Sequence, residues 1–252
     1  MKPMSSPKLT YYDMGAGAVA FSTTRQGGCS TGNYAAFNIN AYCGDDPAHI
    51  AENRLSLSAL LGIPEGHIIM PHQTHGTRIQ RIDAPPTAVV DDTDALMTNV
   101  AGLCIGVSTA DCIPILLYDP QHRAAAAVHA GWRGTVQRIA REAVAAMSRD
   151  YGTIPSQLRA VIGPGISLEA FEVGDEVYDQ FARAGFDMSA IATRFAKWHI
   201  DLPLCNRMQL QAAGVVDIRM SGVCTWTQCN RYFSARRLGI RSGRIFSAIV
   251  LT

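Results

Sequence analysis

The sequence has no long apolar run and no excess of charge of either sign. No window approaches about 18 uninterrupted apolar residues, the length that marks a membrane-spanning helix. Lysine and arginine together number 22, aspartate and glutamate 21, and the formal net charge is +1. This balance gives no sign of a basic nucleic-acid surface or of an acidic tail. We therefore expect no nucleic-acid or membrane partner, and a small ligand that is recognised by local groups.

The cysteines lack the dense, even arrangement of a disulfide-rich secreted scaffold. There are seven, an odd number, scattered between Cys29 and Cys229. Residues 1–14 contain no apolar core of signal-peptide length, so we expect reduced thiols and a cytoplasmic location. No linker separates two halves, and 48% of the 252 residues are apolar. These features predict one domain over residues 1–252.

The stretch of residues 108–135 carries the densest group of informative residues. Residues 113–118 and 124–128 are apolar enough for two buried strands, joined by a polar turn at 119–122. If Tyr118 pairs with Arg123, then Cys112 pairs with His129, with Cβ atoms about 4.5–5.5 Å apart. That spacing suits a thiolate and an imidazole on one zinc ion. A three- or five-residue turn would shift the register by one, so the pairing stays a hypothesis.

A helix is predicted over residues 135–149, because apolar residues recur there at i, i+3 and i+4. Gly131 and Gly134 precede it. Free N–H groups at its start, together with Arg133, would hold phosphate or a carboxylate. The alternative is that the two glycines only form a tight turn between strand and helix.

Three further positions are candidates for a site. His72 and His75 stand three apart near a strand end, where they point to opposite faces, so one metal takes only one of them easily. Asn38 lies in a polar loop over residues 30–40, which either supplies amide groups to a ligand or is a plain surface loop. Arg54 lies in a helix predicted over residues 47–61, where an arginine is normally solvated.

Four motifs in order carry a resemblance to a known family: Gln73-Thr74-His75-Gly76, Thr109-Ala110-Asp111-Cys112, Val128-His129-Ala130-Gly131-Trp132-Arg133-Gly134 and Ile162-Gly163-Pro164-Gly165-Ile166. With them the sequence resembles the laccase-domain (YfiH-like) family. Members are described as polyphenol oxidases, as purine nucleoside phosphorylases with adenosine deaminase activity, and as peptidoglycan editing enzymes. The resemblance implies a zinc ion bound by His75, Cys112 and His129. It also implies a layered, mixed β-sheet core flanked by helices, of the α/β class, like the catalytic domain of cytotoxic necrotising factor.

The number of available ligands separates these activities. A multicopper oxidase uses about ten histidines, often as His-x-His pairs, whereas this chain has seven and no such pair. Two histidines and one cysteine leave the fourth position of a tetrahedral zinc open, as hydrolytic and Lewis-acid sites require. Zinc is therefore the expected cofactor, with copper only as a competitor.

The resemblance, together with this ligand set, implies a zinc-dependent purine nucleoside phosphorylase acting on adenosine, inosine and methylthioadenosine, with adenosine deaminase activity at the same site. Phosphate, held by Arg54 and Arg133, would attack C1′ of the ribose. Asp111 is either a proton carrier and partner of the ligand Cys112, or a structural hydrogen-bond acceptor. Asn38 is a candidate for hydrogen bonds to the substrate.

Two other classes stay open. An amidase acting on a peptidoglycan precursor would use Cys112 as nucleophile and His129 as base. A non-catalytic module stabilised by zinc is disfavoured, because structural zinc normally has four protein ligands.

Overall fold

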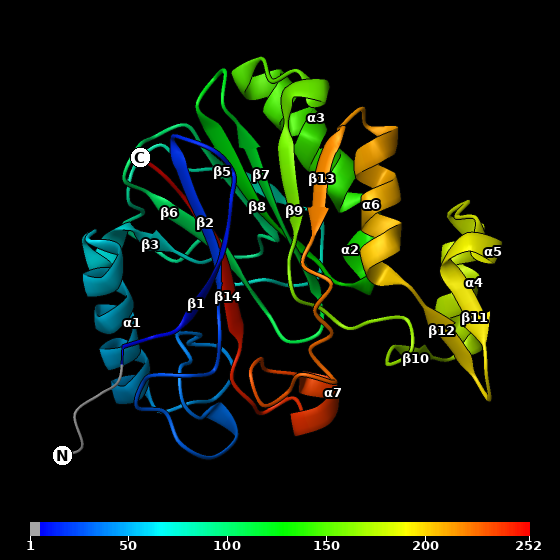
Figure 1. Cartoon of the computed structure of the whole chain (residues 1–252), viewed down its shortest axis with the longest axis horizontal. Coiled ribbons are helices and arrows are strands. Elements are labelled where there is room, and N and C mark those ends of the chain that lie inside the picture. Colours follow the sequence, from blue (N-terminus) through cyan, green and yellow to red (C-terminus); the bar gives the residue numbers. More distant parts are fainter. Residues whose placement is uncertain (1–5) are drawn as a thin grey trace.

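Two large β-sheets form the centre of the fold in the computed structural model, which describes residues 6–252 (Figure 1). The first sheet has the strand order β1-β2-β14-β6-β3, and the second has the order β13-β9-β7-β8-β5-β4. The strands of the first are β1 (Leu9–Tyr12), β2 (Ala18–Thr23), β14 (Ile245–Leu251), β6 (Cys104–Thr109) and β3 (Ile68–Ile69). Those of the second are β13 (Asp217–Met220), β9 (Arg159–Ile162), β7 (Ile113–Asp119), β8 (Ala124–Ala130), β5 (Ala95–Thr98) and β4 (Ile79–Arg81).

Helices cover the outer face of each sheet. Helix α1 (Pro47–Leu61) lies on the five-stranded sheet, and α3 (Ile139–Tyr151) and α6 (Leu202–Ala212) lie on the six-stranded sheet (Figure 1). A smaller sheet, β10 (Glu172–Val173), β12 (Trp198–Ile200) and β11 (Ala192–Arg194), stands to one side with α4 (Asp175–Arg183) and α5 (Met188–Ile191). The remaining short helices are α2 (Trp132–Val136), α7 (Ala235–Leu238), η1 (Gly32–Tyr34), η2 (Glu65–His67) and η3 (Pro155–Gln157).

Alternation of side chains along the strands produces this layering. On β7, Ile115 and Leu117 pack in the cluster that contains the α3 residues, whereas Leu116 belongs to the cluster between the two sheets. On β14, Ile249 lies between the sheets and Phe246 packs in the cluster that contains α1. Successive strand residues point to opposite faces, so each strand contributes to two apolar layers. The predicted α/β class, with layered mixed sheets flanked by helices, is confirmed.

Two loops that carry the chain from one large sheet to the other position the candidate site. Strand β3 belongs to the five-stranded sheet and β4 to the six-stranded sheet, so residues 70–78 cross between them. Strands β6 and β7 are likewise in different sheets, and residues 110–112 form the crossing. His75 lies in the first crossing and Cys112 in the second.

The predicted register of the β7–β8 hairpin was wrong by one residue on each strand. Asp119 pairs with Ala124 and the turn comprises residues 120–123, so His129 pairs with Pro114. The Asp119 side chain accepts the N–H groups of Gln121 at 2.9 Å and His122 at 3.1 Å, which makes the turn begin one residue later. Cys112, two residues before Pro114, is offset from His129 along the hairpin instead of directly opposite it.

The predicted helix over residues 135–149 is two helices. Helix α2 begins at Trp132 with Gly131 as its N-cap, and Arg138, with φ of +69°, separates it from α3. The helix predicted over residues 47–61 matches α1, where the Asp46 carboxylate accepts the Ala48 N–H at 2.8 Å. In residues 6–252 no helix is long and apolar enough to cross a membrane. Of the segment 1–14 considered for a signal peptide, residues 1–5 lie outside the described part.

Candidate metal centre and its cavity

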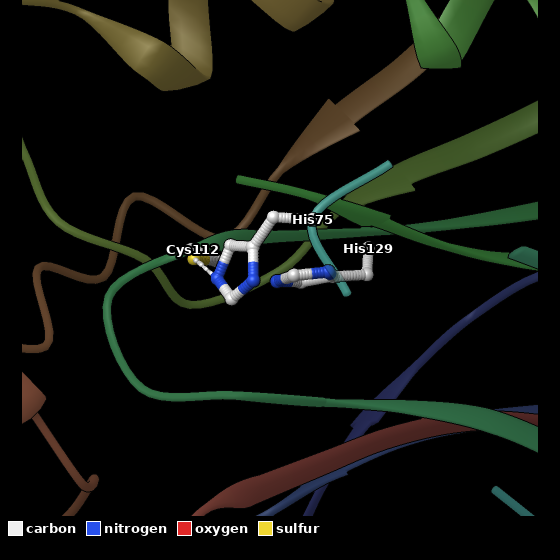
Figure 2. Close-up of side chains that lie close together, drawn as sticks. All are labelled: His75, Cys112 and His129. Carbon is white, nitrogen blue, oxygen red and sulfur yellow. Dashed lines mark hydrogen bonds between the residues drawn. The ribbon is translucent and has the colours of Figure 1, made fainter. Parts of the chain in front are cut away.

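His75, Cys112 and His129 come together at one end of the two sheets. Their ligating atoms all lie within 4.8 Å of one another, and Cys112 Sγ is 3.9 Å from His75 Nε2. The two imidazole rings meet at 78° with centroids 4.8 Å apart, so both are directed at the same point as the thiol (Figure 2). These three are the residues that the family resemblance implied as ligands, and together they form a potential metal site.

Asp94 orients two members of this cluster. Its Oδ1 lies 2.7 Å from His129 Nδ1, so that Nε2 is the nitrogen left for the cluster. The same carboxylate accepts the backbone N–H of His75 at 3.0 Å and of Gly76 at 2.7 Å. Asp94 is fully buried and His129 is 2% exposed. A carboxylate behind a metal-binding histidine fixes the tautomer and the ring orientation, which is the arrangement seen here.

Strand pairing explains why Asp94 lies there. Strand β5 starts at Ala95, which pairs with Val128 of β8, so Asp94 and His129 are neighbours across the ladder. The His129 N–H also donates to the Asp94 carbonyl oxygen at 2.8 Å. The sequence patterns did not single out Asp94. The nearby Asp91 and Asp92 have the same chemistry, and only the pairing of β5 with β8 distinguishes Asp94 from them.

Gly131 provides the room that the cluster needs. A Cβ at this position would lie 2.9 Å from His75 Cδ2 and 3.2 Å from Cys112 Sγ, closer than side chains normally pack. The φ of Gly131 is −68°, which any residue adopts, so the requirement for glycine is one of space and not of backbone conformation. Gly131 therefore leaves the space that the His75 and Cys112 side chains need.

The electrostatics favour a thiolate at Cys112. Burial raises the pKa of this thiol, but the positive charge of His129 and the hydrogen bond with His75 outweigh burial and lower the pKa to about 6. Burial disfavours the charged form of His129, but the Cys112 thiolate and the Asp94 carboxylate raise its pKa to about 9. Metal-free, the cluster is therefore a thiolate paired with an imidazolium.

The donor set fits zinc. One thiolate and two imidazole nitrogens are ligands that zinc prefers, and three protein ligands are the number found in catalytic zinc sites. A tetrahedral zinc with bonds of about 2.0–2.3 Å brings its ligand atoms to roughly 3.5 Å from one another. Cys112 Sγ and His75 Nε2, 3.9 Å apart, are close to this separation, and the ligand atoms as a set, which lie within 4.8 Å of one another, would move closer together on binding zinc.

The cluster opens into a cavity of about 610 Å³, a volume typical of small-molecule sites. The exposed ring of Tyr42 forms part of its wall and contacts the His72 ring, with centroids 4.4 Å apart. The lining contains arginine and histidine but no aspartate or glutamate: Asn40, Tyr42, Cys43, Gly44, Pro71, His72, Gln73, His75, Ser108, Thr109, Ala110, Cys112, His129, Ala235, Ile240, Arg241 and Arg244. Sequence reasoning did not single out Arg241 or Arg244.

Asp111 has the contacts of a structural hydrogen-bond acceptor, the second of its two interpretations. Its Oδ1 accepts the Thr225 hydroxyl and its Oδ2 the Arg236 N–H, both at 2.7 Å. The residue has a φ of +93°, and its carbonyl oxygen accepts the Ile166 N–H at 2.8 Å. Asp111 thus ties the crossing loop that carries Cys112 to the segments around residues 225 and 236.

The structure does not bring the other three predicted residues to the cavity wall. Arg54 forms an ion pair with Glu65 and donates to the Ile68 carbonyl oxygen, and it lines a separate cavity. Arg133 is exposed and lies over the Trp132 ring, 4.4 Å from its centroid. Their predicted roles in binding phosphate stay predictions.

Asn38 is fully buried below the cavity wall. Its amide donates to Asp45 Oδ2 at 2.8 Å, and its carbonyl oxygen accepts the N–H of Asn40 at 3.2 Å and of Arg244 at 3.1 Å. Asn40 and Arg244 both line the cavity. Asn38 therefore holds two wall segments together, and its predicted contact with substrate stays a prediction.

Comparison with known proteins places this arrangement in a family. The sequence pattern of the family described as multi-copper polyphenol oxidoreductase laccase matches residues 19–252. A protein named purine nucleoside phosphorylase from Bacteroides thetaiotaomicron is 46% identical over 245 residues, which cover 92% of this chain and 90% of that protein. Adenosine deaminase RL5, from an unknown prokaryotic organism, is 42% identical over 255 residues, covering 96% and 97%.

Solved structures agree with the sequence comparison. The crystal structure of hypothetical protein YfiH from Bacillus licheniformis superimposes with a TM-score of 0.93 at 28% identity, covering 100% of both chains. That of YlmD from Geobacillus stearothermophilus gives 0.89 at 32% identity, covering 94% of this chain and 92% of its own. This chain therefore belongs to the multi-copper polyphenol oxidoreductase laccase family.

Proposed function

We propose that this protein is a zinc-dependent purine nucleoside phosphorylase that acts on adenosine, inosine and methylthioadenosine, with adenosine deamination as a second reaction. The observation that carries the proposal is the cluster of His75, Cys112 and His129, a three-ligand set that opens into a cavity of about 610 Å³. The names of the relatives, purine nucleoside phosphorylase and adenosine deaminase, support both reactions.

Zinc bound by these three residues would supply Lewis acidity and lower the pKa of a coordinated water toward about 7. The chain's own residues provide positioning. Asp94 keeps His129 Nε2 and the His75 backbone in place. The exposed face of Tyr42 suits a planar purine, because aromatic rings stack on one another in offset geometry. In the phosphorolysis, a phosphate oxygen attacks C1′, the glycosidic C–N bond breaks, and the base takes up the proton of hydrogen phosphate.

Copper-dependent oxidation of polyphenols, although named in the family description, is not the activity that the donor set supports. Within residues 6–252 a single group of three or more histidine, cysteine or acidic side chains gathers its ligating atoms, and it contains only two of the seven histidines. A multicopper oxidase needs several copper ions held mainly by imidazole. One thiolate and two imidazoles can hold zinc or a single copper ion, so it is the number of gathered histidines, and not the type of ligand, that disfavours a multicopper oxidase.

The test is phosphate-dependent release of base from adenosine, inosine and methylthioadenosine by protein whose metal content has been measured. We expect one zinc per chain, activity that chelation abolishes and zinc restores, and no turnover by Cys112→Ala. Ammonia release from adenosine measures the deaminase reaction in the same samples. Absence of base and ammonia release by a fully zinc-loaded protein would refute the proposal.

A second candidate is an amidase acting on a peptidoglycan precursor, with Cys112 as nucleophile and His129 as base. The lowered pKa of Cys112 beside the raised pKa of His129 favours it, because a thiolate–imidazolium pair is the reactive form of such enzymes. Metal removal separates the two candidates. An amidase of this kind keeps its activity after chelation and loses it on alkylation of Cys112, whereas the zinc-dependent reactions stop on chelation.

A further inference from the structure

The segment after α7 supplies two arginine side chains to the cavity wall. Arg241 is exposed and forms no hydrogen bond or ion pair within the described part of the chain. Arg244 is half-buried, and its guanidinium donates to the backbone carbonyl oxygens of Ile240 at 2.8 Å, Ser242 at 2.5 Å and Gly243 at 3.1 Å and to the Ser242 hydroxyl at 3.3 Å. A carbonyl oxygen orients a guanidinium but carries no net charge to neutralise it. Both arginines therefore present uncompensated positive charge at the cavity wall.

No acidic side chain is among the residues that line the cavity. The neighbouring carboxylates have partners of their own: Asp91 lies 2.6 Å from the His72 ring, Asp94 lies 2.7 Å from the His129 ring, and Asp45 accepts the Asn38 amide. Arginine presents several N–H donors in a planar fork that matches the oxygens of phosphate. The cavity thus has the charge and the donors of an anion-binding site.

An unpartnered hydroxyl lies next to these arginines. Thr109 is 1% exposed, lines the cavity, and its Oγ1 has no hydrogen-bond partner in the structure. Buried polar atoms rarely lack a partner, because the loss of hydrogen bonding costs free energy. Strand β14 pairs Ile245 with Thr109, so Arg244, the residue before Ile245, lies at the same sheet end as this hydroxyl. Because the Oγ1 atom is itself buried, a ligand oxygen would reach it only after the Thr109 side chain turns toward the cavity.

Ser108, the neighbour of Thr109 on β6, lines the cavity from the opposite face of the strand. Its Oγ accepts the Asn40 amide at 2.6 Å and so holds another residue of the wall in place. Thr109 precedes Cys112 by three residues, and both line the same cavity. An anion bound by the arginines and Thr109 would therefore share the cavity with the metal cluster.

We propose that Arg241, Arg244 and Thr109 form a subsite for a phosphoryl group. The inference rests on the proposed function, in which phosphate is the second substrate. It assigns phosphate to the residues that line the cavity and not to Arg54 and Arg133. Two sources have the same chemistry, inorganic phosphate and the 5′-phosphate of a purine nucleotide, and the binding experiment distinguishes them.

The experiment is calorimetric titration of the zinc-loaded protein with inorganic phosphate, with adenosine 5′-monophosphate and with adenosine. The main variant is Arg241→Ala, because this exposed side chain makes no contact that folding requires. Arg244→Ala is the second variant, checked for folding by thermal denaturation. Arg207→Ala, which removes an exposed arginine of α6 that does not line the cavity, is the matched control.

We expect Arg241→Ala and Arg244→Ala to weaken phosphate binding about tenfold to a hundredfold, the effect of losing hydrogen bonds to a charged group. Adenosine binding stays within about twofold, and Arg207→Ala binds all three ligands like the wild type. Arg241→Lys loses only part of the affinity, because it keeps the charge without the fork. In turnover, KM for phosphate rises by the same factor and KM for the nucleoside does not.

Unchanged binding of both anions in the two alanine variants would overturn the subsite. Loss of phosphate binding only in Arg54→Ala or Arg133→Ala would also overturn it. An effect confined to the nucleotide supports the subsite and identifies the 5′-phosphate as the occupant. If Arg241→Ala weakens phosphate binding but the wild type releases no base, the subsite stands and the phosphorylase proposal fails.

Discussion

An aspartate–histidine pair lies at each end of the β7–β8 hairpin, but only one of the two pairs adjoins the metal cluster. At the turn, Asp119 Oδ2 lies 2.8 Å from His122 Nδ1; at the other end, Asp94 Oδ1 lies 2.7 Å from His129 Nδ1. The His122 side chain is 31% exposed, whereas His129 is 2% exposed. Among residues 6–252, no thiol or second imidazole forms a ligand group with the turn pair, whereas the other pair adjoins Cys112 and His75. An Asp–His pair therefore supports metal binding only where the second ring nitrogen of the histidine faces other metal ligands.

Substitution of Asp94 and of Asp119 separates the metal-supporting pair from the turn pair, and Asp94→Asn has the largest expected effect. Asp94→Asn places an amide donor against the N–H groups of His75 and Gly76, so the histidine ligands lose their support. We expect zinc affinity to fall about tenfold to a hundredfold, as for other losses of a carboxylate behind a metal ligand. Competition with a chromophoric chelator measures it.

Asp119→Asn is the matched control, since it changes the same atom in the same kind of pair. Its zinc affinity should equal that of the wild type. Equal zinc affinity in Asp94→Asn and the wild type would show that the buried pair is no more than a second structural pair.

Gly131→Ala tests the metal-cluster end of the hairpin by crowding the His75 side chain. Its Cβ would lie 2.9 Å from His75 Cδ2, so the imidazole must move and the cluster distorts. Overpacking of this kind costs about 1–3 kcal/mol, and a cost near the lower end, about 1.4 kcal/mol, would lower zinc affinity roughly tenfold. Gly66→Ala is the control, because no atom lies within 4 Å of a Cβ at Gly66. A zinc affinity of Gly131→Ala that matches the control would mean that the cluster tolerates the methyl group.

The pH dependence of Cys112 alkylation tests the pairing of the Cys112 thiolate with the His129 imidazolium. With a pKa of about 6, the thiol of the metal-free protein is largely thiolate at pH 7, and its alkylation slows as the pH falls through 6. His129→Gln removes the positive charge that opposes burial, so the inflection should move to higher pH. Mass spectrometry of the Cys112 peptide after timed alkylation gives the profile. Wild-type and His129→Gln profiles that coincide would contradict the pairing.

The free energy of unfolding at acid pH tests the Asp119–His122 pair at the turn, and the expected effect is the smallest of the four. Burial raises the pKa of Asp119, but hydrogen bonds from His122 and the backbone N–H groups outweigh burial, and the pKa lies below its usual 3.8. The resulting stabilisation is complete above about pH 4 and is lost as the pH falls through the folded-state pKa. Asp119→Asn should reduce the acid-dependent loss of unfolding free energy by on the order of 1 kcal/mol. Urea titrations between pH 2 and 6 measure it, and an unchanged slope would contradict the assignment.

Local patterns predicted helix α1 well, whereas the set of three ligands came from the resemblance to a family. The helix predicted over residues 47–61 matches α1, because an N-cap followed by proline is a signal within one segment. The motifs around His75, Cys112 and His129 named the three residues that the fold assembles. The hairpin register was missed, since Asp119 ends the strand through side-chain hydrogen bonds that periodicity does not reveal.

The sequence by itself determined the chemistry available to this protein: one cysteine and two histidines in distinctive motifs, and the glycine and arginine segments around them. Only the tertiary structure decided which groups serve that chemistry. Pairing of β5 with β8 selected Asp94 from among three neighbouring acids, and pairing of β14 with β6 brought Arg244 to the end of the sheet where Thr109 lies. The physical reason is that both contacts cross between strands distant in the chain, whereas residue type and spacing describe only neighbours along it. The hairpin end that holds His129 thus acquires its function from strands that the hairpin does not contain.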